Sequence, residues 1–100
     1  MRNVTIQGKE YKLAYNLRSL FIYEEIAGKP FEGKRTVESY VFMYAMLQAN
    51  NDDFDMNFDE LIDVCDADFS IFQTFAEEVE AYTRKMASYA VENKKKEVTL

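Results

Sequence analysis

Two spacings of apolar residues divide the chain. From residue 4 to residue 13, apolar and polar positions alternate, which is typical of strands with one buried face. From residue 17 onward, apolar residues recur every three or four positions, as they do in amphipathic helices. These patterns predict an α+β fold that is mostly α, with an N-terminal β-hairpin packed on a bundle of about four helices, the last of them long.

A glycine marks the turn of the predicted hairpin. Gly8 and Lys9 suit a two-residue turn that has glycine at its first central position. Such a turn pairs Ile6 with Tyr11 and Val4 with Leu13, all on one face. Two strands alone are marginally stable in water, so we expect this apolar face to rest on the helices.

The first predicted helix covers residues 16–27. Asn16 is its N-cap, and Gly28 stands where a left-handed C-cap is favoured. Pro30 then prevents the helix from continuing. The apolar residues that we expect to face the core are Leu17, Leu20, Phe21, Ile22 and Ile26.

The second predicted helix, residues 36–50, is apolar on every side at its centre. Such a helix is surrounded by protein, so we expect it to be the central helix or part of an oligomer interface. Capping boxes begin two further helices, a short one at Asn57 with Glu60 and the last one at Ser70 with Gln73.

The last helix is longer than a body of this size requires. Over residues 70–93 it would extend about 30–35 Å. We therefore expect its C-terminal half to project from the body. Residues 1–93 then form a single domain, and residues 94–100 a flexible tail.

Charge is unevenly distributed. The chain has 12 basic and 18 acidic residues, a net charge of −6, and residues 36–83 contain no Lys or Arg. Nucleic-acid binding needs clustered cations, so we expect no nucleic-acid partner. No apolar run reaches the roughly 18 residues of a membrane span, and we expect no membrane contact. The acidic middle either keeps an aromatic-rich domain soluble or selects a basic protein partner.

Few residues in the chain suit catalysis. There is no His, so Cys65, the one cysteine, has no imidazole to activate it and is expected in the core. Four residues match EF-hand ligand positions, but the required glycine and the bidentate glutamate are both missing. These four are Asp53, Asp55, Asn57 and Asp59. We therefore expect no enzyme, no cofactor and no metal site.

Apolar side chains are abundant for so small a body, with five Met, seven Tyr and eight Phe. They either fill the core or form a surface that accepts apolar helical segments of a partner. The candidate partner-binding residues on the second interpretation are Met43, Met46, Phe54, Met56, Phe69, Tyr82, Met86 and Tyr89.

The first half of the chain carries a family resemblance. Residues 5–13, TIQGKEYKL, and residues 16–31, NLRSLFIYEEIAGKPF, resemble the small tail assembly chaperones of long-tailed bacteriophages and prophages. In that family, a short hairpin leads into a helix of this type, followed by an apolar helix and a mostly helical remainder. The likeness beyond residue 50 is one of length and helical layout alone.

The resemblance implies a binding function without catalysis. The implied partner is the tape measure protein, whose apolar helical segments are held while the tail tube forms, with the tail tube protein as a second partner. It also implies self-association, here through helix 36–50 or helix 70–93. The location implied is the cytoplasm of the bacterial host, and such chaperones are absent from the mature virion. The alternative is a small acidic phage regulator or inhibitor that binds a basic, DNA-binding protein.

Overall fold

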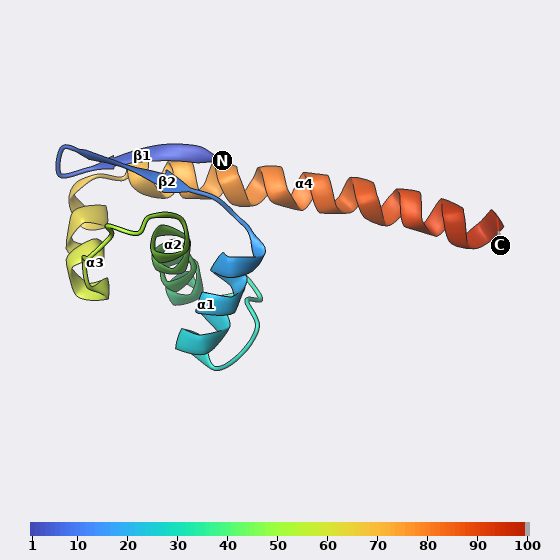
Figure 1. The fold of residues 1–100 in the computed structure, drawn as a ribbon, viewed down its shortest axis with the longest axis horizontal. Helices are drawn as coiled ribbons and strands as arrows, with labels where there is room; N and C mark the ends of the chain where they lie inside the picture. The colour runs from blue at the N-terminus through green and yellow to red at the C-terminus, as the bar shows by residue number, and fades with distance from the viewer. Residues whose placement is uncertain (100) are drawn as a thin grey trace.

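The computed structural model describes the backbone of residues 1–99 and the side chains of residues 1–89. Over this range, an antiparallel hairpin is followed by four helices, which confirms the predicted α+β, mostly α fold (Figure 1). The strands are β1 (Arg2–Ile6) and β2 (Lys9–Leu13), and the helices are α1 (Leu17–Ala27), α2 (Thr36–Asn50), α3 (Phe58–Ala67) and α4 (Ser70–Thr99).

The turn of the hairpin lies one residue earlier than predicted. Gln7 and Gly8 are its central residues, and both have positive φ, 53° and 80°. Two consecutive left-handed residues form a turn whose twist matches that of the strands. Val4 therefore pairs with Tyr11, and Ile6 with Lys9. The predicted pairing was wrong by two residues, a shift that leaves every side chain on its face, so the predicted apolar face is buried.

The capping residues of the first and third helices are confirmed. Asn16 Oδ1 accepts the Ser19 N–H at 2.9 Å, and Gly28 ends α1 in the left-handed conformation with φ 74°. Asn57 Oδ1 accepts the Glu60 N–H at 2.9 Å at the start of α3. These signals are local in sequence, which is why the residue types alone predict them.

The start of the last helix differs in detail. Ser70 is the first residue of α4 and not its cap. The carboxylate of Asp68 accepts both the Ser70 N–H at 3.0 Å and the Ser70 hydroxyl at 2.6 Å. These hydrogen bonds hold the pKa of Asp68 below its usual value. Asp68, two residues before the helix, thus accepts the N-terminal hydrogen bonds that we expected the Ser70 side chain to accept.

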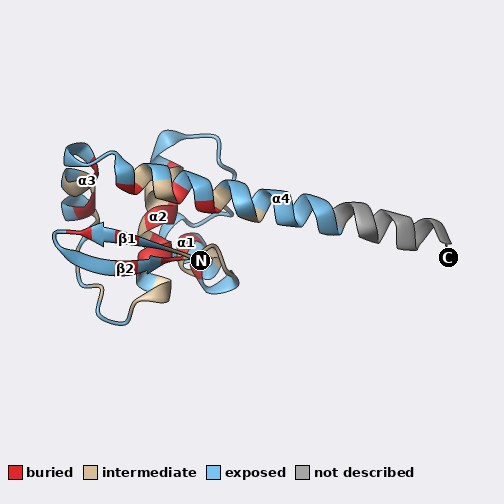
Figure 2. Ribbon diagram, turned by 90° about the horizontal axis from the view of Figure 1, so that it is seen from above, coloured by how far each residue is buried: buried red, intermediate tan, exposed pale blue. Residues whose placement is uncertain are grey.

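Helix α2 is the central helix, which is one of the two alternatives predicted for it. Its buried residues, apart from Glu38, are Phe42, Met43, Ala45, Met46 and Leu47. It packs against α1, β2 and α3, while the hairpin strand β1 packs against α4. In Figure 2 the buried segments lie where the hairpin, α2, α3 and the first half of α4 meet.

Helix α1 presents a different face to the core from the one predicted. Ser19 and Tyr23 are its buried residues, whereas the side chains of Leu17 and Phe21 are 66% and 57% exposed. Ile26 is exposed as well. The expectation that these apolar residues face inward was therefore wrong for three of the five.

Polar interactions explain which face of α1 is buried. The Ser19 hydroxyl donates to the Ala14 carbonyl at 2.9 Å, so its burial leaves no unpaired polar group. The Tyr23 ring packs edge-on against Phe31 and Phe42, with centroids 5.4 and 5.7 Å away. Ser19 and Tyr23 thus lie on the buried face of α1, whereas Leu17, Phe21 and Ile26 are left outside.

Helix α4 runs past the body of the protein (Figure 1). Ile71, Phe75 and Glu78 are buried, whereas every described side chain from Thr83 to Tyr89 is exposed. The helical backbone reaches Thr99, and the molecule measures 52 × 26 × 25 Å. The structure does not describe the side chains beyond Tyr89 or any part of Leu100, so the flexible tail at 94–100 remains a prediction.

Candidate functional site

Met43 and Met46, two of the candidate partner-binding residues, are core residues. Both are fully buried in α2, and the Met43 Sδ lies 3.8 Å from the Cys65 Sγ. A side chain without accessible surface does not touch a partner while the domain stays folded. We therefore do not carry these two residues forward as part of a binding surface.

Phe54 and Met56 lie in the loop between α2 and α3 and are half-buried. The Phe54 ring packs edge-on against Tyr11 and Tyr44, with centroids 5.5 and 5.8 Å away. Met56 packs against the same core. These residues close the core beneath the hairpin, and their main contacts are internal.

The four remaining candidates lie at or beside α4. Phe69, Met86 and Tyr89 are 64%, 40% and 50% exposed. Tyr82 is half-buried against Tyr15. Tyr82, Met86 and Tyr89 are spaced i, i+4, i+7 and so share one face of the helix. Beyond the body, this face forms an apolar stripe, and no described residue of another element packs on Met86 or Tyr89 there.

An apolar groove runs along α4 beside this face. It has a volume of about 680 Å³ and lies between α4, α2 and the connection from α1 to α2. Its α4 wall includes Phe72, Phe75 and Val79, spaced i, i+3, i+7. The remaining lining residues are Phe31, Glu32, Gly33, Ser39, Ala76, Glu80, Thr83 and Arg84. We call this the apolar groove.

Aromatic rings extend the apolar groove toward the start of α4. Phe72 lies 5.8 Å from Phe75 and 5.8 Å from Phe69, measured between ring centroids. Tyr40 of α2 lies 5.2 Å from Phe72. Phe69, a predicted site residue, is thus the exposed end of a row of rings that leads into the groove.

The charged residues at the rim of the groove are paired with each other. Arg84 forms an ion pair with Glu80 one turn earlier on α4. Lys34 lies 3.4 Å from the Glu32 carboxylate. The rim is therefore close to neutral, and what the groove offers a partner is mainly apolar surface.

Sequence reasoning missed the groove because its residues come from distant segments. The spacing of Phe72, Phe75 and Val79 is typical of a buried helix face as well, and Phe31 lies in the connection between two predicted helices. The one available signal was an aromatic residue within a connection that is otherwise polar and glycine-rich. The exposed pair Leu17 and Phe21 was missed too, since an apolar stripe has the same spacing whether it faces protein or water.

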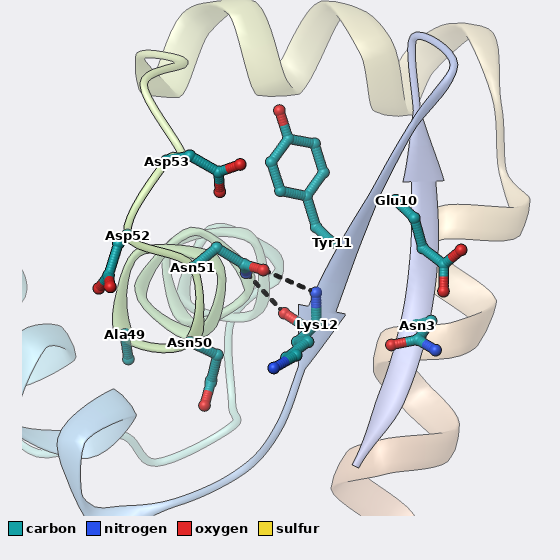
Figure 3. A pocket seen from close by; sticks show the side chains of 9 residues that line it. All are labelled: Asn3, Glu10, Tyr11, Lys12, Ala49, Asn50, Asn51, Asp52 and Asp53. Carbon is teal, nitrogen blue, oxygen red and sulfur yellow. Dashed lines mark hydrogen bonds between the residues drawn. The ribbon is translucent and has the colours of Figure 1, made fainter.

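A second groove is polar, and two of its lining residues are joined to each other by hydrogen bonds. It has a volume of about 590 Å³ and lies between β2 and the end of α2. In Figure 3, Asn51 reaches from the end of α2 to Lys12 of β2. Its side chain accepts the Lys12 N–H at 2.8 Å and donates to the Lys12 carbonyl at 2.8 Å, as a neighbouring strand would.

An ion pair lies beside this polar groove. Lys9 Nζ lies 2.7 Å from the Asp53 carboxylate. This hydrogen-bonded contact lowers the pKa of Asp53 and raises the pKa of Lys9. Asn51 and Asp53 thus use their side chains to hold the hairpin, through Lys12 and Lys9. The polar groove is therefore not our candidate for a ligand site.

The described residues contain no cluster of three His, Cys, Asp or Glu side chains with the geometry of a metal site. Asn57, one of the EF-hand matches, is engaged in capping α3. Burial raises the pKa of the Cys65 thiol to about 11, so it is protonated and weakly nucleophilic at neutral pH. Over the same part of the chain, no helix combines the length and the apolar character needed to cross a bilayer.

No family model, curated protein or solved structure matches the chain.

Proposed function

We propose that the chain is a tail assembly chaperone of a long-tailed phage or prophage, and that it binds apolar helical segments of the tape measure protein without catalysis. The observation that carries the proposal is the apolar groove with the exposed apolar stripe on the projecting half of α4. The N-terminal resemblance supplies the identity of the partner.

The dimensions of the groove suit an amphipathic helix. Its volume of about 680 Å³ lies within the range of roughly 300–1,000 Å³ that is typical of binding clefts. A helix docks in such a groove through anchors spaced i, i+3 or i+4, and i+7. The groove wall of Phe72, Phe75 and Val79 presents a row of apolar side chains against which such anchors can pack.

The projecting part of α4 extends this surface. Met86 and Tyr89 are exposed on a helix that continues beyond the body. Methionine adapts its shape to varied apolar partners, and tyrosine combines a large apolar ring with a polar tip. These properties suit a long client whose successive segments differ in sequence.

One observation favours the alternative function, an acidic regulator that binds a basic protein. Asp59, Asp63 and Asp66 are exposed along α3, and the described side chains provide no ion-pair partner for them. Binding through this face would weaken steeply as salt is raised, whereas binding through the apolar groove would be salt-tolerant. Salt dependence therefore separates the two functions.

Co-expression with the tape measure protein of the same phage genome tests the proposal. We expect the wild-type chain to keep the tape measure protein soluble and to co-purify with it at both 0.1 M and about 1 M salt. If the tape measure protein aggregates equally with and without the chain, the proposal is wrong. Capture that is lost at high salt would support the acidic regulator instead.

A matched pair of lysine substitutions locates the binding site. Ala76→Lys places a charge in the apolar groove, and Ala81→Lys places the same charge at an exposed position of α4 outside it. Each new lysine has a glutamate four residues away on the helix, Glu80 or Glu77, so both positions offer an opposite charge. We expect Ala76→Lys to weaken client binding at least about tenfold and Ala81→Lys to leave it unchanged.

A further inference from the structure

The connection between α1 and α2, residues 28–35, forms one wall of the apolar groove. We call it the strap. It contributes Phe31, Glu32 and Gly33 to the groove lining. Within the described part of the chain, residues 29–34 make two hydrogen bonds to the rest of the protein. Both go to Glu38. The strap is therefore attached to the body at few points.

Glu38 is a buried carboxylate in the first turn of α2. Its Oε2 accepts the N–H groups of Glu32 and Gly33, each at 3.2 Å. A buried carboxylate is costly unless it accepts hydrogen bonds, and these two backbone groups supply them to its Oε2. The position of the strap and the hydrogen bonding of Glu38 thus depend on each other.

The second attachment point is the ring of Phe31. Its centroid lies 4.4 Å from that of Phe42 and 5.4 Å from that of Tyr23. Phe31 itself is only half-buried, whereas Phe42 and Tyr23 are fully enclosed. The chain thus places one of its own aromatic rings over an aromatic socket at the inner side of the groove.

The backbone of the strap suits this inward placement. Gly33 has φ 70°, a conformation that other residues rarely adopt, and a Cβ at this position would lie 3.6 Å from the Phe31 ring. Gly28 is also left-handed, with φ 74°. The strap thus contains two left-handed glycines, Gly28 at its start and Gly33 beside the Glu38 contact, whose dihedral angles allow sharp changes of direction.

We propose that the strap is a lid of the apolar groove, that Glu38 holds it closed, and that Phe31 is a built-in plug which an aromatic side chain of the client replaces. Moving the strap away uncovers the socket formed by Tyr23, Phe42 and Phe75. The seated Phe31 ring shows which chemistry this socket accepts. The identity of the client rests on the proposed function, whereas the lid is a property of the free protein.

The free protein tests the lid by amide hydrogen exchange at Glu32 and Gly33. Glu38→Gln weakens the two hydrogen bonds, and Glu60→Gln is the matched control, because Glu60 occupies the same position in α3 but is exposed. We expect exchange at Glu32 and Gly33 to rise about tenfold or more in Glu38→Gln alone. Unchanged exchange would contradict the lid.

The same measurement distinguishes local opening from loss of the fold. Core amides of α2, such as those of Met46 and Leu47, report global unfolding. We expect them to keep their wild-type exchange rates in Glu38→Gln. If they accelerate in parallel with Glu32 and Gly33, the strap does not open independently and the proposal is wrong.

Client binding tests the plug. Apolar helical peptides from the tape measure protein, each with one Phe or with that Phe replaced by Ala, are titrated against the wild-type chain and against Glu38→Gln. We expect the Phe peptide to bind at least about tenfold more tightly than the Ala peptide, to deprotect the strap amides, and to bind Glu38→Gln more tightly than wild type.

The outcomes separate the two proposals. If no peptide binds, the proposed function fails and the exchange experiment on the free protein still decides the lid. If peptides bind while the strap amides stay protected, the lid is wrong and the proposed function stands. If Glu38→Gln dimerises in light scattering, the socket accepts a second copy of this chain, which would overturn the client as its occupant.

Discussion

The ring of Tyr15 stacks on the ring of Tyr82, with centroids 3.6 Å apart and planes inclined by 4°. The Tyr15 N–H also donates to the buried carboxylate of Glu78 at 3.0 Å. Burial raises the pKa of Tyr15, and the nearby Tyr82 adds to the shift. These contacts join the segment after the hairpin to α4 at the last turn before the helix leaves the body.

Loss of this stack should loosen α4. We expect Tyr82→Ala to lower the free energy of unfolding by about 1–2 kcal/mol, since a half-buried aromatic contact is lost. Tyr89→Ala, which removes an exposed ring of the same type, is the control and should change it by less than about 0.5 kcal/mol. Urea denaturation measures both, and equal losses would show that the stack contributes nothing.

Asn51 should anchor the hairpin. Asn51→Ala removes its two hydrogen bonds to the Lys12 backbone and a third to the Leu47 carbonyl, and we expect a loss of about 1–2 kcal/mol in the free energy of unfolding. Asn3→Ala, at an exposed position of β1, is the control. Thermal or urea unfolding gives the difference, and equal stability of the two variants would mean that water replaces the Asn51 amide without cost.

The face of α1 can be tested by truncation. Tyr23→Ala should cost about 3–5 kcal/mol, because it leaves a cavity between α1 and α2. Phe21→Ala, at an exposed position two residues earlier, should cost less than about 0.5 kcal/mol. If the Phe21 substitution proves the more costly, the stripe predicted from sequence and not the observed face packs on the core.

Cys65 should make stability fall at alkaline pH. Its thiol pKa is raised from 9.0 to about 11 in the folded protein, so the folded state holds a proton that the unfolded state loses. The associated stability is present below about pH 9 and is lost as the pH rises toward about 11. Urea unfolding at several pH values should show a smaller alkaline loss in Cys65→Ala than in wild type, while identical slopes would contradict the shift.

Local features of this chain were predictable from residue type. Asn16, Gly28 and Asn57 act on backbone groups within four residues, so their side chains determine where helices begin and end. Apolar alternation likewise determined which face of each strand is buried. It did not determine the register, because a shift of two residues leaves that face unchanged, and the turn geometry at Gln7 and Gly8 decided it.

Tertiary packing decided the rest. Helix α1 has apolar residues on most of its circumference, and the fit of Ser19 and Tyr23 to their neighbours selected the buried face. The surplus of Met and aromatic residues was visible in the sequence, but only the three-dimensional contacts separated the enclosed Met43 from the exposed Met86. The groove joins Phe31 to residues more than forty positions later, and no periodicity reports such a contact, since burial depends on which segments meet.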